Sequence, residues 1–116
     1  MPKDHLGEFE QLALLAVLRL GDGAYGARLQ EELQTAAGRE ASVSTIYITL
    51  TRLEGRGMAS SWMGRPSEIR GGKARRYFKV EQPGLLALHR ARAGLINLWS
   101  GLEQTLDGMH GATHEG

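Results

Sequence analysis

The chain has 116 residues, a formal net charge of +1 and no cysteine. This length suits one domain with a hydrophobic core, and the lack of cysteine excludes disulfides and thiolate metal sites. No apolar run approaches the roughly 20 residues of a membrane-spanning helix, and the charged start "MPKDHLGEFE" is unlike a signal peptide, so we expect a cytoplasmic protein.

Two helices are predicted in the first third of the chain. Residues 8–20, "EFEQLALLAVLRL", are rich in Leu and Ala and precede Gly21, which predicts a buried helix. Residues 24–38 place Tyr25, Leu29 and Leu33 four apart and end at Gly38, a suitable C-cap. This pattern predicts an amphipathic helix, and we expect Tyr25 to close the first two helices around the small Gly26.

The next segment, residues 42–55, reads "SVSTIYITLTRLEG" and fits two patterns. Alternation would place Ile46, Ile48 and Leu50 on one face of a strand, as its many β-branched residues favour. A helix would instead bury Val43, Ile46, Leu50 and Leu53, with Ser42 as N-cap and Gly55 as a stop. The helix explains the cap, the stop and Leu53 together, so we predict a helix.

A β-hairpin with a basic tip is predicted over residues 58–80. "MASSWM" and "KARRYFKV" are short and partly alternating, and "GRPSEIRGG" between them contains Pro and paired Gly. Phe78 and Val80 would share the core face, with Arg75, Tyr77 and Lys79 on the other. Residues 65–79 carry six Lys and Arg against one Glu; such a block suits a nucleic-acid surface or a solvated loop.

A long last helix is predicted over residues 82–110, with residues 111–116 as a disordered tail. Pro83 suits its first turn, and about 26 helical residues would span about 39 Å at 1.5 Å per residue. An apolar seam repeats every seven residues, which favours pairing with a second copy, although the helix could also fold back on its own domain. The predicted dimer contacts are Leu88, Leu95, Leu98, Trp99, Leu102 and Leu106.

This order of elements is that of a winged helix-turn-helix. We therefore expect a mainly α fold with a small β-hairpin, in which residues 1–81 bind DNA and one long C-terminal helix dimerises. A helix-turn-helix places its second helix in the major groove of DNA. In this chain the motif would consist of residues 24–38 and 42–55, so the helix in the groove would be 42–55. Opposite Ile46, that helix carries groups that suit base edges and phosphates: Ser44, Thr45, Ile48, Thr51 and Arg52.

The residues also resemble the PadR family of bacterial transcriptional regulators, over about residues 6–102. The matching segments are "LGEFEQLALLAVLRLGDGAYGARLQEEL", "SVSTIYITLTRLEGRGM" and "RGGKARRYFKV". The resemblance implies a homodimer that binds a palindromic operator on double-stranded DNA and usually represses a promoter. It also implies DNA contacts from the start of the third helix and from the wing: Ser42, Ser44, Thr45, Tyr47, Arg70, Lys73, Arg75 and Arg76.

The sequence departs from the family pattern at three positions. Many relatives have Gly or Ala in place of Ser44, and Pro or Thr in place of Ile48, so base contacts cannot be copied from them. Glu81 replaces a Thr that would cap the last helix, which predicts a later start or fraying. A single helix follows the wing, as in members with a short C-terminal region.

Two aromatic residues have alternative roles. Tyr47, at the margin of the buried face, either packs in the fold or contacts a phosphate. Trp99 either packs in a dimer core or lines a site for a small planar aromatic effector, since such compounds stack on tryptophan and family ligands lodge near the dimer interface.

No catalytic, cofactor or metal site is predicted. The chain lacks a nucleophile, paired carboxylates or a phosphate loop at a spacing that supports catalysis, so we expect it not to be an enzyme. The alternative to DNA binding is a winged-helix module for protein–protein interaction, which the near-neutral net charge and the apolar last helix would also suit.

Overall fold

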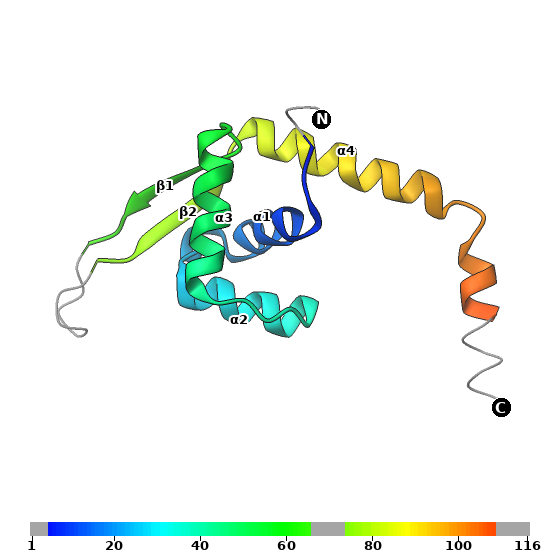
Figure 1. Cartoon of the computed structure of the whole chain (residues 1–116), viewed down its shortest axis with the longest axis horizontal. Coiled ribbons are helices and arrows are strands. Elements are labelled where there is room, and N and C mark those ends of the chain that lie inside the picture. The colour runs from blue at the N-terminus through cyan, green and yellow to red at the C-terminus, as the bar shows by residue number, and fades with distance from the viewer. Residues whose placement is uncertain (1–4, 66–73, 109–116) are drawn as a thin grey trace.

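The computed structural model describes residues 5–65 and 74–108, which form a mainly helical fold with one β-hairpin (Figure 1). The helices are α1 (Glu8–Leu20), α2 (Gly26–Ala37), α3 (Val43–Gly55) and α4 (Gln82–Trp99); the strands are β1 (Ala59–Met63) and β2 (Arg76–Val80). The strands pair antiparallel, and Tyr25 adds an isolated backbone bridge to Tyr77 of β2. This arrangement confirms the predicted mainly α fold with a winged helix-turn-helix.

The core lies where α1, α2, α3 and β2 meet. Its largest fully buried side chains are Phe78, Leu14, Leu29, Ile46, Leu50 and Leu53. The segment with strand-like composition is therefore a helix, because Ile46, Leu50 and Leu53 recur at helical spacing and are buried in the core. Val43, which was also expected on this face, is half-buried. Thr49 is also buried on this side, a position the sequence pattern had not assigned.

The first turns of α4 dock on the base of the hairpin. A Cβ at Gly84 would collide with the carbonyl oxygen of Met58, so only glycine allows this approach. Ala87 and Leu88 are buried next to it. α4 begins at Gln82, the first residue predicted for it, so the replacement of the capping Thr by Glu81 does not delay its start, although Glu81 provides no side-chain cap.

The prediction of one continuous helix from residue 82 to residue 110 is wrong within the described residues, which end at 108. α4 ends at Trp99, and Gly101 adopts a left-handed φ of 86° before a further helical turn over residues 103–108. A residue with positive φ cannot continue the hydrogen-bond ladder of a right-handed helix. The seven-residue repeat therefore spans two helical segments that meet at a bend (Figure 1).

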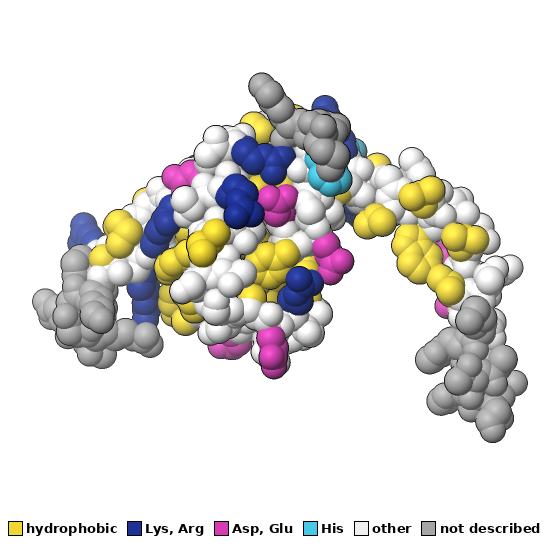
Figure 2. Space-filling view, in the orientation of Figure 1, with side chains coloured by type: hydrophobic (Ala, Val, Ile, Leu, Met, Phe, Trp, Pro, Cys, Tyr) yellow, Lys and Arg dark blue, Asp and Glu magenta, His cyan; other side chains and the backbone are white. Residues whose placement is uncertain are grey.

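Beyond its docked turns, α4 extends away from the domain as an arm (Figure 1). The radius of gyration is 17.5 Å, against about 13 Å for a compact chain of this length. Hydrophobic side chains gather over the outer half of α4, while Lys and Arg side chains lie on the wing and around α3 (Figure 2). Within the described part of the chain, no helix is both long and apolar enough to cross a membrane.

Candidate nucleic-acid interface

The outer face of α3 is exposed and carries the predicted side chains. Ser44, Thr45, Ile48, Thr51 and Arg52 are all exposed. Ile48 keeps 60% of its surface accessible, more than most apolar residues of the fold. The helical pattern thus placed this face correctly, opposite the buried Ile46, Leu50 and Leu53.

Ser42 caps the start of α3. Its Oγ accepts a hydrogen bond of 3.0 Å from the backbone N–H of Thr45 and donates one of 2.9 Å to Thr45 Oγ1. The N-cap satisfies a donor that the first helical turn leaves without a partner. The hydroxyl groups of Ser42 and Thr45, which were predicted to contact DNA, therefore bond to each other at the start of the helix, and that of Ser42 also caps the helix.

Tyr47 packs inside the fold, which is one of its two predicted roles. Its ring lies 5.7 Å from that of Phe78, and the side chain is half-buried. Gly26 approaches this ring so closely that an added Cβ would lie 2.8 Å from Tyr47 Oη. Gly26 therefore makes room for α3 and not for α1, contrary to the sequence-based expectation.

The solvent face of the wing holds a row of stacked groups. The guanidinium carbon of Arg75 lies 4.3 Å from the centre of the Tyr25 ring. Tyr25 meets Tyr77 edge-on at 5.5 Å, and Tyr77 stacks on Trp62 at 5.8 Å. This row orders Arg75 beside α2 and packs Trp62 on the wing. The predicted contacts Arg70 and Lys73 lie outside the described residues.

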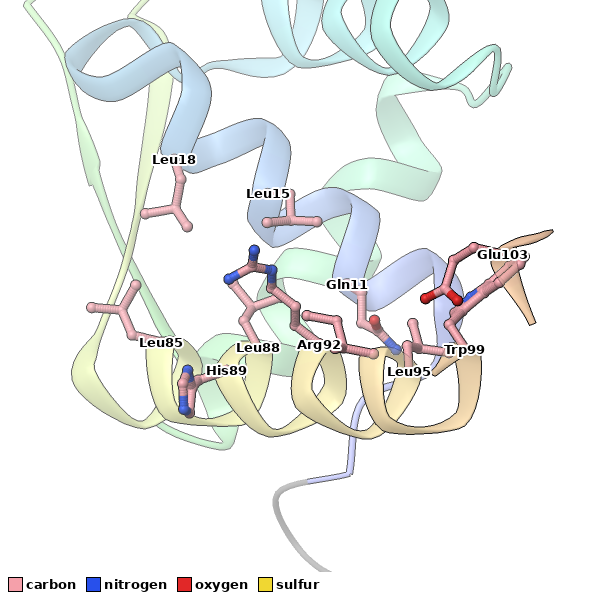
Figure 3. A pocket seen from close by; sticks show the side chains of 11 residues that line it. Gln11, Leu15, Leu18, Leu85, Leu88, His89, Arg92, Leu95, Trp99 and Glu103 are labelled. Carbon is pink, nitrogen blue, oxygen red and sulfur yellow. The ribbon is translucent and has the colours of Figure 1, made fainter. Parts of the chain in front are cut away.

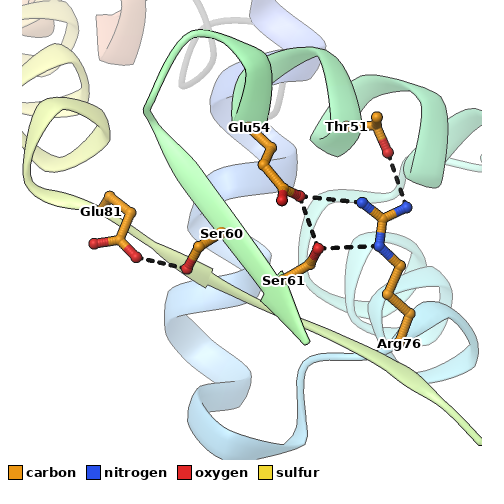
Figure 4. A network of polar contacts seen from close by, with 6 residues as sticks. All are labelled: Thr51, Glu54, Ser60, Ser61, Arg76 and Glu81. Atoms are coloured by element: carbon orange, nitrogen blue, oxygen red, sulfur yellow. Dashed lines mark hydrogen bonds and ion pairs between the residues drawn. The ribbon is translucent and has the colours of Figure 1, made fainter. Parts of the chain in front are cut away.

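Arg76 lies on the other face of β2 and points toward α3 (Figure 4). Nε donates to Ser61 Oγ at 3.1 Å, Nη1 to Thr51 Oγ1 at 3.0 Å, and Nη2 to Glu54 Oε1 at 3.1 Å. Sequence reasoning grouped this arginine with the DNA contacts and missed the network. The signal was available, because alternation places Arg76 on the same strand face as the buried Phe78.

A groove runs between α1 and α4 (Figure 3). Its volume is about 510 Å³, and Leu15 and Leu18 of α1 face Leu85, Leu95 and Ile96 of α4 across it. Trp99 and Glu103 lie at one end, with Gln11 and Arg92 as further polar groups. Leu98 and Leu102 do not line this groove; they lie with Trp99 in a separate pocket of about 170 Å³, together with Leu95 and Leu106.

The predicted dimer residues divide into two groups. Leu88 is buried in the core of its own chain. The other members are exposed, from 42% for Leu106 to 77% for Leu98: Leu95, Leu98, Trp99, Leu102 and Leu106. The exposed group lies on the arm that leaves the domain.

Solved structures with the same fold include transcriptional regulators from several bacteria. One from Clostridium thermocellum has a TM-score of 0.63 at 18% identity and covers 82% of this chain and 89% of its own. A PadR family regulator from Eggerthella lenta has a TM-score of 0.63 at 26% identity and covers 85% of this chain and 86% of its own.

Bacillus subtilis PadR, solved in complex with operator DNA, has a TM-score of 0.58 at 20% identity. The match covers 72% of this chain and 47% of that protein. A search of the curated proteins gave no match.

One protein-family model matches most of the fold described above. The model of the transcriptional regulator PadR-like family matches residues 14–90, from the middle of α1 to the middle of α4. Members of this family are transcriptional regulators and not enzymes, which confirms the prediction that this chain is no enzyme. The chain therefore belongs to the PadR-like family of transcriptional regulators.

Proposed function

We propose that this protein is a homodimeric repressor that binds a palindromic operator and is released by a small planar aromatic compound. The observation that carries the proposal is the two-sided character of α3. One side is buried against the core, and the other exposes hydroxyl groups, Ile48 and Arg52 beside a basic wing. A solvated helix would favour Glu, Lys and Ala at these exposed positions.

Each part of this surface suits a different DNA contact. Ser44 and Thr45 offer short hydroxyls to base edges, Ile48 offers an apolar contact to a thymine methyl, and Arg52 reaches guanine or phosphate. Arg75 provides positive charge from the wing. Arg70 and Lys73 belong to the same basic segment of the sequence. The structural similarity to Bacillus subtilis PadR, solved with operator DNA, supports this assignment.

The arm formed by α4 supports a homodimer. Its exposed Leu95, Leu98 and Trp99 form an apolar surface that a monomer would leave in water. A second copy would cover this surface and relate the two α3 helices by twofold symmetry. Such a dimer would read half-sites about 34 Å apart, one turn of DNA.

The groove between α1 and α4 supports an effector site. Its volume of about 510 Å³ lies within the range of small-molecule sites. Apolar side chains line most of it, and Trp99 offers a ring for stacking at one end. Because the groove adjoins the proposed dimer surface, a bound compound would change how two copies meet.

Selection of bound DNA from a random pool tests the proposal. We expect enrichment of a palindrome whose half-sites lie about one helical turn apart. Expression of a reporter gene under the selected operator should fall when the protein is produced, and it should recover when the effector is added. Lack of any enriched sequence would overturn DNA binding and favour a protein-interaction module. Enrichment of a single half-site would overturn the dimer.

A further inference from the structure

Arg76 joins the wing to α3 through a closed set of contacts (Figure 4). Its guanidinium donates to Ser61 on β1 and to Thr51 and Glu54 on α3, with distances of 3.0–3.1 Å. Ser61 Oγ in turn donates to Glu54 Oε1 at 2.8 Å. The guanidinium carbon also lies 4.7 Å from the centre of the buried Phe78 ring. Each nitrogen of the guanidinium therefore has a partner within the chain.

These partners oppose a role for Arg76 as a phosphate contact. The ion pair with Glu54 is only partly accessible, at 29% and 35% of the two side chains. If Arg76 turned to a phosphate, the Glu54 carboxylate would lose its cation close to a polyanion. A half-buried carboxylate without its partner is unfavourable.

Arg75 provides the contrast on the same strand. It lies on the opposite face of the hairpin, over the Tyr25 ring. Within residues 5–65 and 74–108 the Arg75 guanidinium has no hydrogen bond or ion pair, although the Arg75 backbone carbonyl accepts a hydrogen bond of 2.7 Å from the Gly64 N–H. A cation held by stacking alone keeps its donors for phosphate.

We propose that Arg76 is a positioning residue, which clamps the wing to the second half of α3 through Glu54. β2 starts at Arg76, so the clamp sits where the basic segment enters the hairpin. It fixes the angle between the wing and the helix, and both then meet DNA as one unit. Thr51, exposed on the outer face, serves this clamp and does not read bases. The effect on DNA binding rests on the proposed function, but the clamp itself does not.

A double-mutant cycle in the DNA-free protein tests the clamp. Arg76→Ala, Glu54→Ala and the double variant are unfolded with urea. We expect the two single effects to be non-additive by at least about threefold in the unfolding equilibrium constant. Additive effects would overturn the clamp, whether or not the protein binds DNA.

Operator binding at several salt concentrations tests the role in recognition. Arg76→Lys keeps the charge but loses the planar fork. It should weaken binding by about tenfold, the value of one charged hydrogen bond, with an unchanged salt slope. Glu54→Gln should also weaken binding, although removing a negative charge near DNA would by itself strengthen it.

The matched control is Arg75→Ala, which should reduce the log–log salt slope by about 0.9, as loss of one phosphate contact does. If Arg76→Lys binds like the wild type and Arg76→Ala lowers the slope by this amount, Arg76 is a phosphate contact and the inference is wrong. If the wild type selects no DNA, the proposed function fails, and the urea cycle alone decides on the clamp.

Discussion

Gly26 lies directly against Tyr47, so that a Cβ built on this glycine would be 2.8 Å from Tyr47 Oη and 2.7 Å from Val43 Cγ1. Both neighbours belong to α3, and the Tyr47 ring also packs on Phe78. Gly26→Ala should therefore push α3 away from α2 and lower the free energy of unfolding by about 1–3 kcal/mol, the usual cost of overpacking. Urea unfolding followed by circular dichroism measures this change.

Gly55→Ala is the matched control for that variant. Gly55 is the last residue of α3, has no positive φ, and nothing lies within 4 Å of an added Cβ. Alanine there should leave stability unchanged or raise it by up to about 1 kcal/mol. Equal losses in both variants would show that the contact with Tyr47 is not the cause.

Two substitutions of Ser42 should distinguish its effect on the stability of α3 from its effect on DNA binding. Ser42→Ala removes the bond that caps Thr45 N–H and should cost about 1 kcal/mol of stability. Ser42→Asp should keep the cap, because aspartate is an equally good N-cap. The added negative charge should nevertheless weaken DNA binding. Urea unfolding and gel shifts on the same variants measure both effects; full DNA affinity in Ser42→Asp would place this residue away from the DNA.

The sequence predicted the elements whose pattern repeats locally. The helical spacing of Ile46, Leu50 and Leu53 predicts a helix for α3, and this periodicity is a stronger indication than the many β-branched residues, which favour a strand. The cap at Ser42 and the exposure of Ile48 follow from that same register. Phe78 on the core face of the hairpin follows from alternation in the same way.

Other features depend on contacts between distant segments. The bend at Gly101 interrupts a seven-residue repeat that by itself predicts one helix. The partnership of Arg76 with Glu54 joins positions 22 residues apart. A count of charges cannot distinguish that arginine from Arg75, since the difference lies in which strand face meets α3.

Ile48 should determine which operator is preferred. Because this side chain is 60% exposed, Ile48→Ala should change stability by no more than about 0.5 kcal/mol. It should reorder the sequences selected from a random pool, as expected for loss of an apolar base contact. Arg75→Ala should instead weaken binding to all sequences alike. Identical sequence preferences in Ile48→Ala and the wild type would remove Ile48 from the base-reading set.

The outer half of α4 should hold the dimer together. Leu98 is 77% exposed in the single chain, so Leu98→Glu should leave each domain folded and raise the dimer dissociation constant at least tenfold, or about 1.4 kcal/mol. Sedimentation velocity measures this shift. Ile48→Glu is the matched control, an apolar-to-Glu change at another exposed site. The Ile48→Glu variant should sediment as a dimer and lose DNA binding. If the Leu98→Glu variant dimerises as tightly as the wild type, the dimer interface lies elsewhere.

Binding of a planar aromatic compound should be visible in the fluorescence of Trp99, which lies at the end of the α1–α4 groove. In a Trp62→Phe background, which leaves Trp99 as the only tryptophan, phenolic acids and planar dyes should quench the emission saturably. Leu15→Glu places a charge in the apolar lining and should weaken this binding about tenfold. Leu86→Glu, at a residue of equal exposure outside the groove, should bind as tightly as the parent. Equal weakening by both variants would place the compound outside the groove, and an unchanged emission across the panel would eliminate the effector site.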